Sequence, residues 1–127
     1  MKYFLILTAL LVTSSTMAQK VFWGAYELPP KSSEKSASMM AKQAGKAKEL
    51  VVISEAGDTL EVIGFILVGK NRGNLIDHPA KGARITPTQK KYIYALRQGT
   101  KFWLEHIRIK GTDGEVKEID DRTIRIK

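Results

Sequence analysis

One apolar stretch near the middle of the chain, residues 59–69, constrains the fold more than any other part of the sequence. Its hydrophobic side chains alternate on both faces of an extended chain: Leu60, Val62, Ile66 and Val68 on one, and Ile63, Phe65 and Leu67 on the other. Such a strand needs packing partners on both sides. We therefore expect residues 59–69 to be the central strand, and Ile66→Asp to abolish folding. Gly64 within the stretch predicts a β-bulge or the close approach of a neighbouring element.

Turn-forming residues connect this stretch to further β-prone segments. Residues 49–54 precede it, separated by the turn-forming residues 55–58, so the two segments are expected to form a hairpin. Residues 101–110 and 115–127 are expected to be two final strands joined through 111–114, where Asp113-Gly114 is a strong hairpin signal.

Between these hairpins the sequence predicts a long loop and then a helix. Residues 70–84 are expected to be irregular, and long loops on rigid scaffolds often carry binding sites. Thr86 is the candidate N-cap, Pro87 fits the first helical position, and Gln89 completes a capping box. Gly99 is the expected helix end, giving about three turns packed on a sheet.

The segment before residue 49 carries the candidate binding residues. Residues 20–27 are β-prone, and Pro29-Pro30 ends them, which predicts a short edge strand or an arm. Its aromatic residues Phe22, Trp23 and Tyr26 are the candidate partner-binding residues, because aromatic side chains bury large areas in interfaces. The alternative is that they fold back onto the core of their own domain. Residues 31–37 read as an exposed connection, and 38–44 as a short helical turn ending at Gly45.

The first 18 residues have the features of a cleavable signal peptide. Lys2 precedes the apolar run 3–12, and Thr16-Met17-Ala18 provides a cleavage site after Ala18. The apolar run is too short for a membrane-spanning helix, which makes an uncleaved anchor the weaker alternative. The remainder, 19–127, is expected to be one domain, with an arm and connection at 19–37 and a core at 38–127. This predicts a periplasmic or secreted protein with no transmembrane segment after signal removal.

Composition narrows the classes of function. The chain has 127 residues, 21 basic and 13 acidic side chains, a formal charge of +8 and no cysteine, which excludes disulfides and cysteine chemistry. The basic excess is spread along the chain and suits an acidic protein surface, an acidic glycan or phosphate. Nucleic-acid binding is not expected, because no reading motif or stacking platform accompanies the charge.

The order of these features resembles the C-terminal domain of the gliding-motility protein GldM, a periplasmic subunit of the type IX secretion machinery. The resemblance covers about residues 36–127 and is more specific from Gly82 onward. The residues that carry it are Gln43-x-Gly45-x-Ala47, Val62-Ile63-Gly64-Phe65, Gly82, Ile85-Thr86, the capped helix to Leu96, Gly99, Phe102, Ile107, Lys110, Asp113-Gly114 and Ile124-Arg125-Ile126.

In that family the domain ends a long, membrane-anchored, dimeric shaft that contacts ring components of the secretion channel and passes on movement from a proton-driven motor. Here a signal peptide and one small domain are expected in place of shaft and anchor. The resemblance therefore implies a free, exported interaction module without a motor role. It supplies no catalytic residue and no securely transferable binding residue.

No enzymatic chemistry is predicted. The two histidines, His78 and His106, lack metal-ligand spacing, and no serine stands in a nucleophile motif. The acidic cluster near the C-terminus does not match a calcium loop; it consists of Asp113, Glu115, Glu118, Asp120 and Asp121. No cofactor, metal or catalytic residue is therefore expected.

The sequence thus predicts a mainly β (α+β) domain, a compact antiparallel sheet or sandwich with one short helix packed on it. Its expected function is to bind another protein of the cell envelope, or a second copy of itself, with type IX secretion or gliding components as candidates. Two alternatives stay open: a basic envelope module that binds acidic glycan or lipid headgroups, whose binding would weaken steeply with salt, and a small-ligand carrier, which would contain a sizeable apolar cavity.

Overall fold

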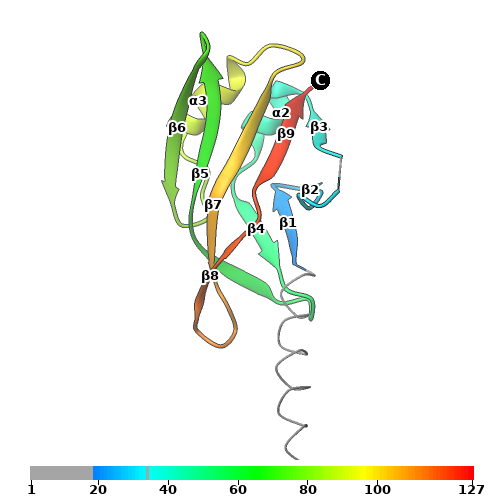
Figure 1. Cartoon of the computed structure of the whole chain (residues 1–127), viewed down its shortest axis with the longest axis vertical. Helices are drawn as coiled ribbons and strands as arrows, with labels where there is room; N and C mark the ends of the chain where they lie inside the picture. Colours follow the sequence, from blue (N-terminus) through cyan, green and yellow to red (C-terminus); the bar gives the residue numbers. More distant parts are fainter. Residues whose placement is uncertain (1–18, 34) are drawn as a thin grey trace, which may run out of the picture.

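The computed structural model describes residues 19–33 and 35–127, and Figure 1 shows its elements. The expected signal peptide, residues 1–18, lies outside the described residues. The elements are β1 (Lys20–Trp23), β2 (Tyr26–Leu28), β3 (Ala37–Met39), α2 (Ala41–Lys46), β4 (Leu50–Ile53), β5 (Thr59–Asn71), β6 (Asn74–Lys81), α3 (Pro87–Tyr94), β7 (Lys101–Lys110), β8 (Val116–Ile119) and β9 (Arg122–Ile126).

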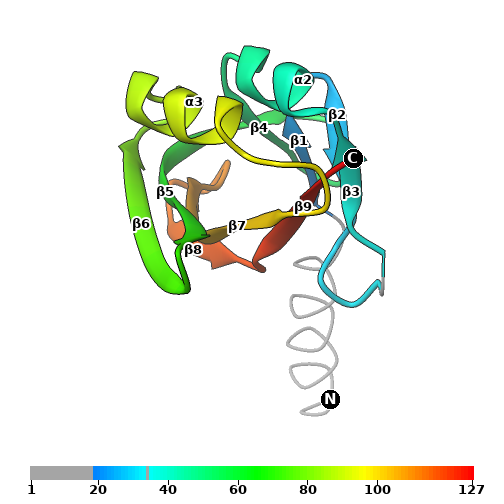
Figure 2. The same cartoon turned by 90° about the horizontal axis from the view of Figure 1, so that it is seen from above.

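The nine strands of the described residues form one sheet that curls into a nearly closed barrel (Figure 2). The strand order is β2-β1-β4-β5-β7-β9-β3, with β6 added beside β5 and β8 beside β7. Neighbouring strands are antiparallel except β3 and β9, which are parallel. The two helices lie side by side on the side of the barrel opposite β7 and β9 (Figure 2). The predicted β-rich α+β class is confirmed; the described residues form a mixed sheet and contain two helices where one was expected.

Strand β5 is central, as its apolar pattern predicts, because it pairs with β4, β6 and β7. The pattern itself has a different cause from the expected one. The pairing with β7 shifts register on both sides of Gly64, so the strand changes the face that it turns inward. Before this bulge Leu60 and Val62 are buried, and after it Phe65 and Leu67 are buried.

The bulge corrects the expectation for Ile66. This residue falls on the outer face and is only partly buried, so Ile66→Asp is expected to cost less than the loss of folding. Both expectations for Gly64 are confirmed, because the bulge is accompanied by close approach of a neighbouring strand. A Cβ atom at Gly64 would lie 2.9 Å from the Ala80 carbonyl oxygen.

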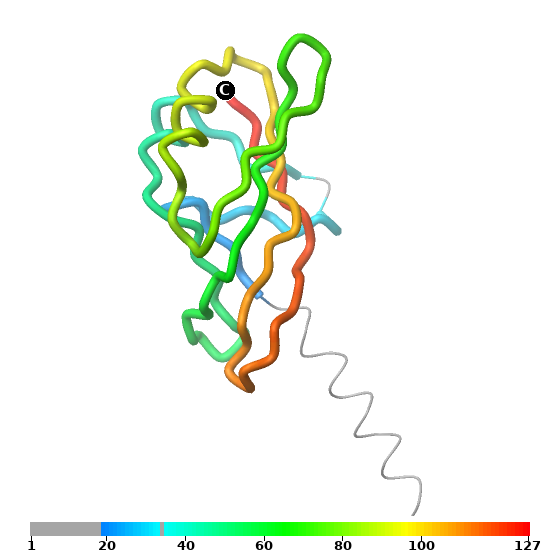
Figure 3. The backbone as a smooth tube through the Cα atoms, turned by 90° about the vertical axis from the view of Figure 1, so that its left-hand side faces the viewer, coloured from blue at the N-terminus to red at the C-terminus, as the bar shows by residue number. Residues whose placement is uncertain are grey.

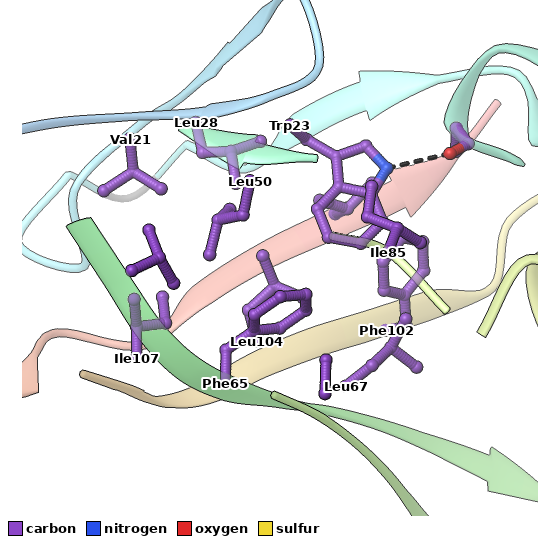
Figure 4. Packing of buried hydrophobic residues seen from close by; sticks show 14 of the residues in the cluster. Val21, Trp23, Leu28, Leu50, Phe65, Leu67, Ile85, Phe102, Leu104 and Ile107 are labelled. Atoms are coloured by element: carbon purple, nitrogen blue, oxygen red, sulfur yellow. Dashed lines mark hydrogen bonds between the residues drawn. The ribbon is translucent and has the colours of Figure 1, made fainter. Parts of the chain in front are cut away.

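The barrel interior is filled by large side chains (Figure 4). The indole of Trp23 packs edge-on against Phe65, with ring centroids 6.1 Å apart, and against Phe102, with ring centroids 5.9 Å apart. Its Nε1 donates a hydrogen bond of 2.8 Å to the Ala44 carbonyl oxygen of α2. Leu104 and Ile107 complete this layer from β7, and both are fully buried.

Of the two alternatives for residues 20–27, a short edge strand or an arm, the arm is wrong, and the short strand β2 lies at the end of the strand order. Strand β1 forms a hairpin with β2 and also pairs along its length with β4, so both strands belong to the barrel wall. The helix expected at 38–44 begins three residues later, because residues 37–39 form β3 on β9. Gly45 lies inside α2 instead of ending it, where the Tyr94 ring occupies the space that a side chain would need.

The expected irregular stretch 70–84 is mostly a β-hairpin. Strands β5 and β6 continue to a two-residue turn at Arg72 and Gly73, whose φ angles of 54° and 85° match the twist of a hairpin. This hairpin projects past the rest of the barrel (Figure 3). The sequence did not predict this hairpin for two reasons. Pro79 in β6 is a residue that strands usually exclude, and the turn requires a positive φ at Arg72, which non-glycine residues rarely adopt.

The C-terminal half follows the prediction closely. Thr86 Oγ1 accepts a hydrogen bond of 3.1 Å from the Gln89 amide, and Gln89 Oε1 accepts one of 3.0 Å from the Thr86 amide, which confirms the capping box. The helix ends at Tyr94, before the expected stop at Gly99. The hairpin at 111–114 is also confirmed, although its second strand is divided into β8 and β9 opposite the positive φ of His106.

Candidate functional site

A groove runs across the outer face of β5, β6, β7 and β9 and is bordered by the connection between β2 and β3. Its volume is about 590 Å³. We call it the outer groove. Its lining residues are Pro29, Pro30, Lys31, Ser33, Lys35, Ser36, Val68, Lys70, Leu75, Lys101, Trp103, Glu105, Asp121 and Thr123.

Strand alternation turns these side chains outward. In β7, Phe102 and Leu104 point into the core and are fully buried, so Trp103 between them faces away from the core. Trp103 is directly opposite Val68 of β5 and Thr123 of β9. An indole therefore occupies the middle of the outer face, with an aliphatic neighbour on one side.

The floor of the outer groove is apolar although it lies on the surface. Val68 is 5% exposed and Trp103 is half-buried, whereas Leu75 on the projecting hairpin is 66% exposed. An exposed leucine alone is ordinary on a protein surface. Here it lies in one groove with an indole and a valine, an arrangement typical of an interaction site.

Basic side chains predominate among the charged residues around this floor. Among the described residues that line the outer groove, four are lysines and two are acidic; they are Lys31, Lys35, Lys70 and Lys101, with Glu105 and Asp121. The outer groove thus combines an apolar floor with an excess of positive charge. A partner segment that combines apolar and acidic side chains would complement it.

Contacts from α3 fix the end of β5 that carries Lys70. The Tyr92 hydroxyl donates a hydrogen bond of 3.2 Å to the Lys70 carbonyl oxygen. The Tyr92 ring occupies the space where a side chain on Gly69 would lie, so glycine is required there. Burial raises the pKa of Tyr92 above its ordinary value. The contacts of Tyr92 therefore fix the backbone of β5 at the position of Lys70.

The three predicted partner-binding residues do not share one surface. Trp23 is fully buried in the core, which confirms for this residue the alternative that it folds back onto its own domain and makes an exposed interface role for it wrong. Its position in β1 turns it inward with Val21, while Phe22 between them faces outward and is half-buried. Tyr26 is 39% exposed. Partner binding by Phe22 and Tyr26 stays a prediction.

Sequence reasoning missed the residues that line the outer groove. In the sequence, Trp103 is one residue of a β-prone segment. The alternation of side chains along a strand places it on the face opposite to Phe102 and Leu104, and this is the one signal that could have found it. The outer groove combines β5, β6, β7 and β9 with the β2–β3 connection, so no local motif could reveal it.

The histidines and acidic residues do not gather into one centre. The His78 ring packs on Tyr92 with centroids 5.0 Å apart, and His106 Nδ1 lies 3.3 Å from Glu118 Oε1. Across the part of the chain that the structure describes, no three potential metal ligands come together. Within the same residues, no helix has the length and apolar character needed to cross a membrane.

No family model matches this sequence, and no curated protein matches it either.

Proposed function

We propose that this chain is a non-enzymatic, exported protein–protein interaction module that binds a partner of the cell envelope in the outer groove. The observation that carries the proposal is the outward indole of Trp103, which lies beside Val68 and lines the same groove as Leu75. Tryptophan in a partly enclosed site is among the residues that contribute most to protein interfaces.

The partner that fits best is a segment with an apolar side chain flanked by acidic ones. The apolar group would pack against Trp103 and Leu75, and its carboxylates would lie near Lys70 and Lys101. Such peripheral charges speed encounter more than they add affinity. The apolar floor and the lysines lie on one face of the molecule, so one short partner segment can contact both.

The filled interior of the barrel argues against a small-ligand carrier. Trp23, Phe65 and Phe102 pack against one another at its centre, and each is at most 2% exposed. A carrier needs enclosed space for its ligand, whereas the outer groove is on the surface.

The association with type IX secretion or gliding components, and the periplasmic or secreted location, belong to the same proposal. Their support is the order of sequence features that resembles the GldM C-terminal domain and the signal-peptide features of residues 1–18. The predominance of β-structure is compatible with this reading.

Affinity purification from the protein's own envelope fraction tests the proposal. Tagged wild-type chain is compared with Trp103→Ala and with Val116→Ala, a matched control because Val116 is an outward apolar residue of β8 that is 58% exposed. We expect specific partners to be recovered with wild type and the control but lost with Trp103→Ala. Equal recovery with all three would contradict the proposal. Binding only to anionic glycan or lipid, abolished by salt and insensitive to Trp103→Ala, would favour the alternative envelope module.

A further inference from the structure

Arg122 at the start of β9 is a cation enclosed within the protein. Its side chain falls on the inward face, in register with Leu104 of β7, and the residue is only 5% exposed. Among the described residues, its Nε and Nη1 atoms are buried and have no hydrogen-bond partner. Buried polar groups in folded proteins are almost always hydrogen-bonded, and an unpaired buried charge is costly. The position therefore requires a partner for the guanidinium.

Arg122 is also one of the residues that line a hollow of about 460 Å³. We call it the Arg122 hollow. It lies between the start of β1, the β2–β3 connection and the junction of β8 with β9, and its lining residues are Gln19, Pro30, Ser32, Lys117, Glu118, Ile119, Asp120 and Arg122. None of these residues except Pro30 belongs to the outer groove.

The nearest internal candidate does not satisfy Arg122. Burial lowers the pKa of Arg122, and the nearby Asp120 opposes this shift only in part. The two side chains nevertheless form no ion pair among the described residues, where the one salt bridge joins His106 and Glu118. The Nε and Nη1 donors thus have no hydrogen-bond partner among the described residues.

We propose that the Arg122 hollow binds a carboxylate, with Arg122 as the principal donor. Guanidinium N–H groups recognise planar oxyanions through charge-assisted hydrogen bonds. The lining contains two basic and two acidic residues, which favours a singly charged carboxylate over a doubly charged phosphate. Pro30 and Ile119 provide contact for an aliphatic group attached to the carboxylate, and Ser32 provides a neutral hydroxyl.

The test measures the Arg122 side chain directly in the folded full chain. Nitrogen-15 NMR follows its Nε–Hε signal, assigned by comparison with Arg122→Lys, during titration with butyrate. We expect a saturable shift with butyrate and none with butyramide, which has the same shape without charge, or with sodium chloride at equal ionic strength. Inorganic phosphate is expected to bind at least tenfold more weakly than butyrate.

Two further arms separate the sources of the carboxylate and control for folding. Acetyl-alanyl-valine is compared with its C-terminal amide and with butyrate. If the free acid binds more tightly than butyrate and the amide does not bind, the natural ligand is a peptide C-terminus. If the free acid and butyrate bind equally, the natural ligand is a small carboxylate. Isothermal titration calorimetry measures butyrate binding in the variants, because Arg122→Lys lacks the Nε–Hε signal. Arg122→Lys should weaken binding at least tenfold, whereas Arg108→Lys, at an exposed position of β7, should leave it unchanged. A Nε–Hε signal that does not respond to butyrate, or responds equally to butyramide, chloride or phosphate, would overturn the proposal.

Discussion

The indole Nε1 of Trp23 donates a 2.8 Å hydrogen bond to the main-chain carbonyl of Ala44, which joins strand β1 to helix α2 inside the core (Figure 4). Trp23 and Ala44 are both fully buried, so no water can replace this bond at the carbonyl oxygen. The residue therefore both fills the barrel and satisfies a buried acceptor at the end of a short helix.

Trp23→Phe should destabilise the protein by about 1–3 kcal/mol, because the Ala44 carbonyl loses its donor and the smaller ring leaves a gap. Urea denaturation measures the change. The matched control is Trp103→Phe, the same substitution on the outer face, where we expect a change of about 0.5 kcal/mol or less. Similar losses for the two variants would contradict the assignment of Trp23 to the core and Trp103 to the surface.

Gly45 and Tyr94 should behave as a coupled pair. A Cβ atom at Gly45 would lie 2.7 Å from Cε1 of the Tyr94 ring, so Gly45→Ala should destabilise the wild-type protein. In a Tyr94→Ala background the obstruction is gone, and the same substitution should stabilise by about 0.5–1 kcal/mol through helix propensity. A double-mutant cycle in chemical denaturation measures the difference, and additive effects would show that the two residues are not in contact.

Thr86→Ala should cost about 1 kcal/mol, because it removes the side-chain acceptor of the Gln89 amide at the first turn of α3. Equilibrium unfolding decides it, with Thr112→Ala, at an exposed hairpin position, as the control expected to change little. An unchanged midpoint for Thr86→Ala would mean that the cap does not contribute to the stability of the fold.

Features that depend on near neighbours in the chain were predictable from the sequence. The Thr86–Gln89 capping box and the turn at Asp113-Gly114 are examples, since a few consecutive residues determine each of them. The outer groove was not predictable, because it depends on which strands become neighbours. The inward position of Trp23 follows from the pairing of β1 with β4, and that of Leu67 from the bulge at Gly64.

Tyr92 should make stability depend on pH in the alkaline range. Burial raises its pKa in the folded protein, so the folded state holds the phenolic proton more tightly than the unfolded chain does. Its contribution is complete below the unfolded pKa of about 10 and is lost as pH rises through the folded pKa. We expect the alkaline fall in unfolding free energy to be shallower in Tyr92→Phe than in wild type. Denaturation series from neutral to strongly alkaline pH measure both slopes, and identical slopes would refute this role.

Site-specific photocrosslinking tests the central claim most directly, because it reports which surface the partner touches. A photoreactive phenylalanine analogue replaces Leu75, the exposed residue of the outer groove, or Val116 on β8 as the matched control, with exposed fractions of 66% and 58%. We predict that irradiation of the envelope fraction joins a specific partner protein to the chain carrying the probe at position 75 and leaves the position 116 chain uncrosslinked. Crosslinks to the same protein from position 116 alone, or from both positions equally, would contradict binding in the outer groove.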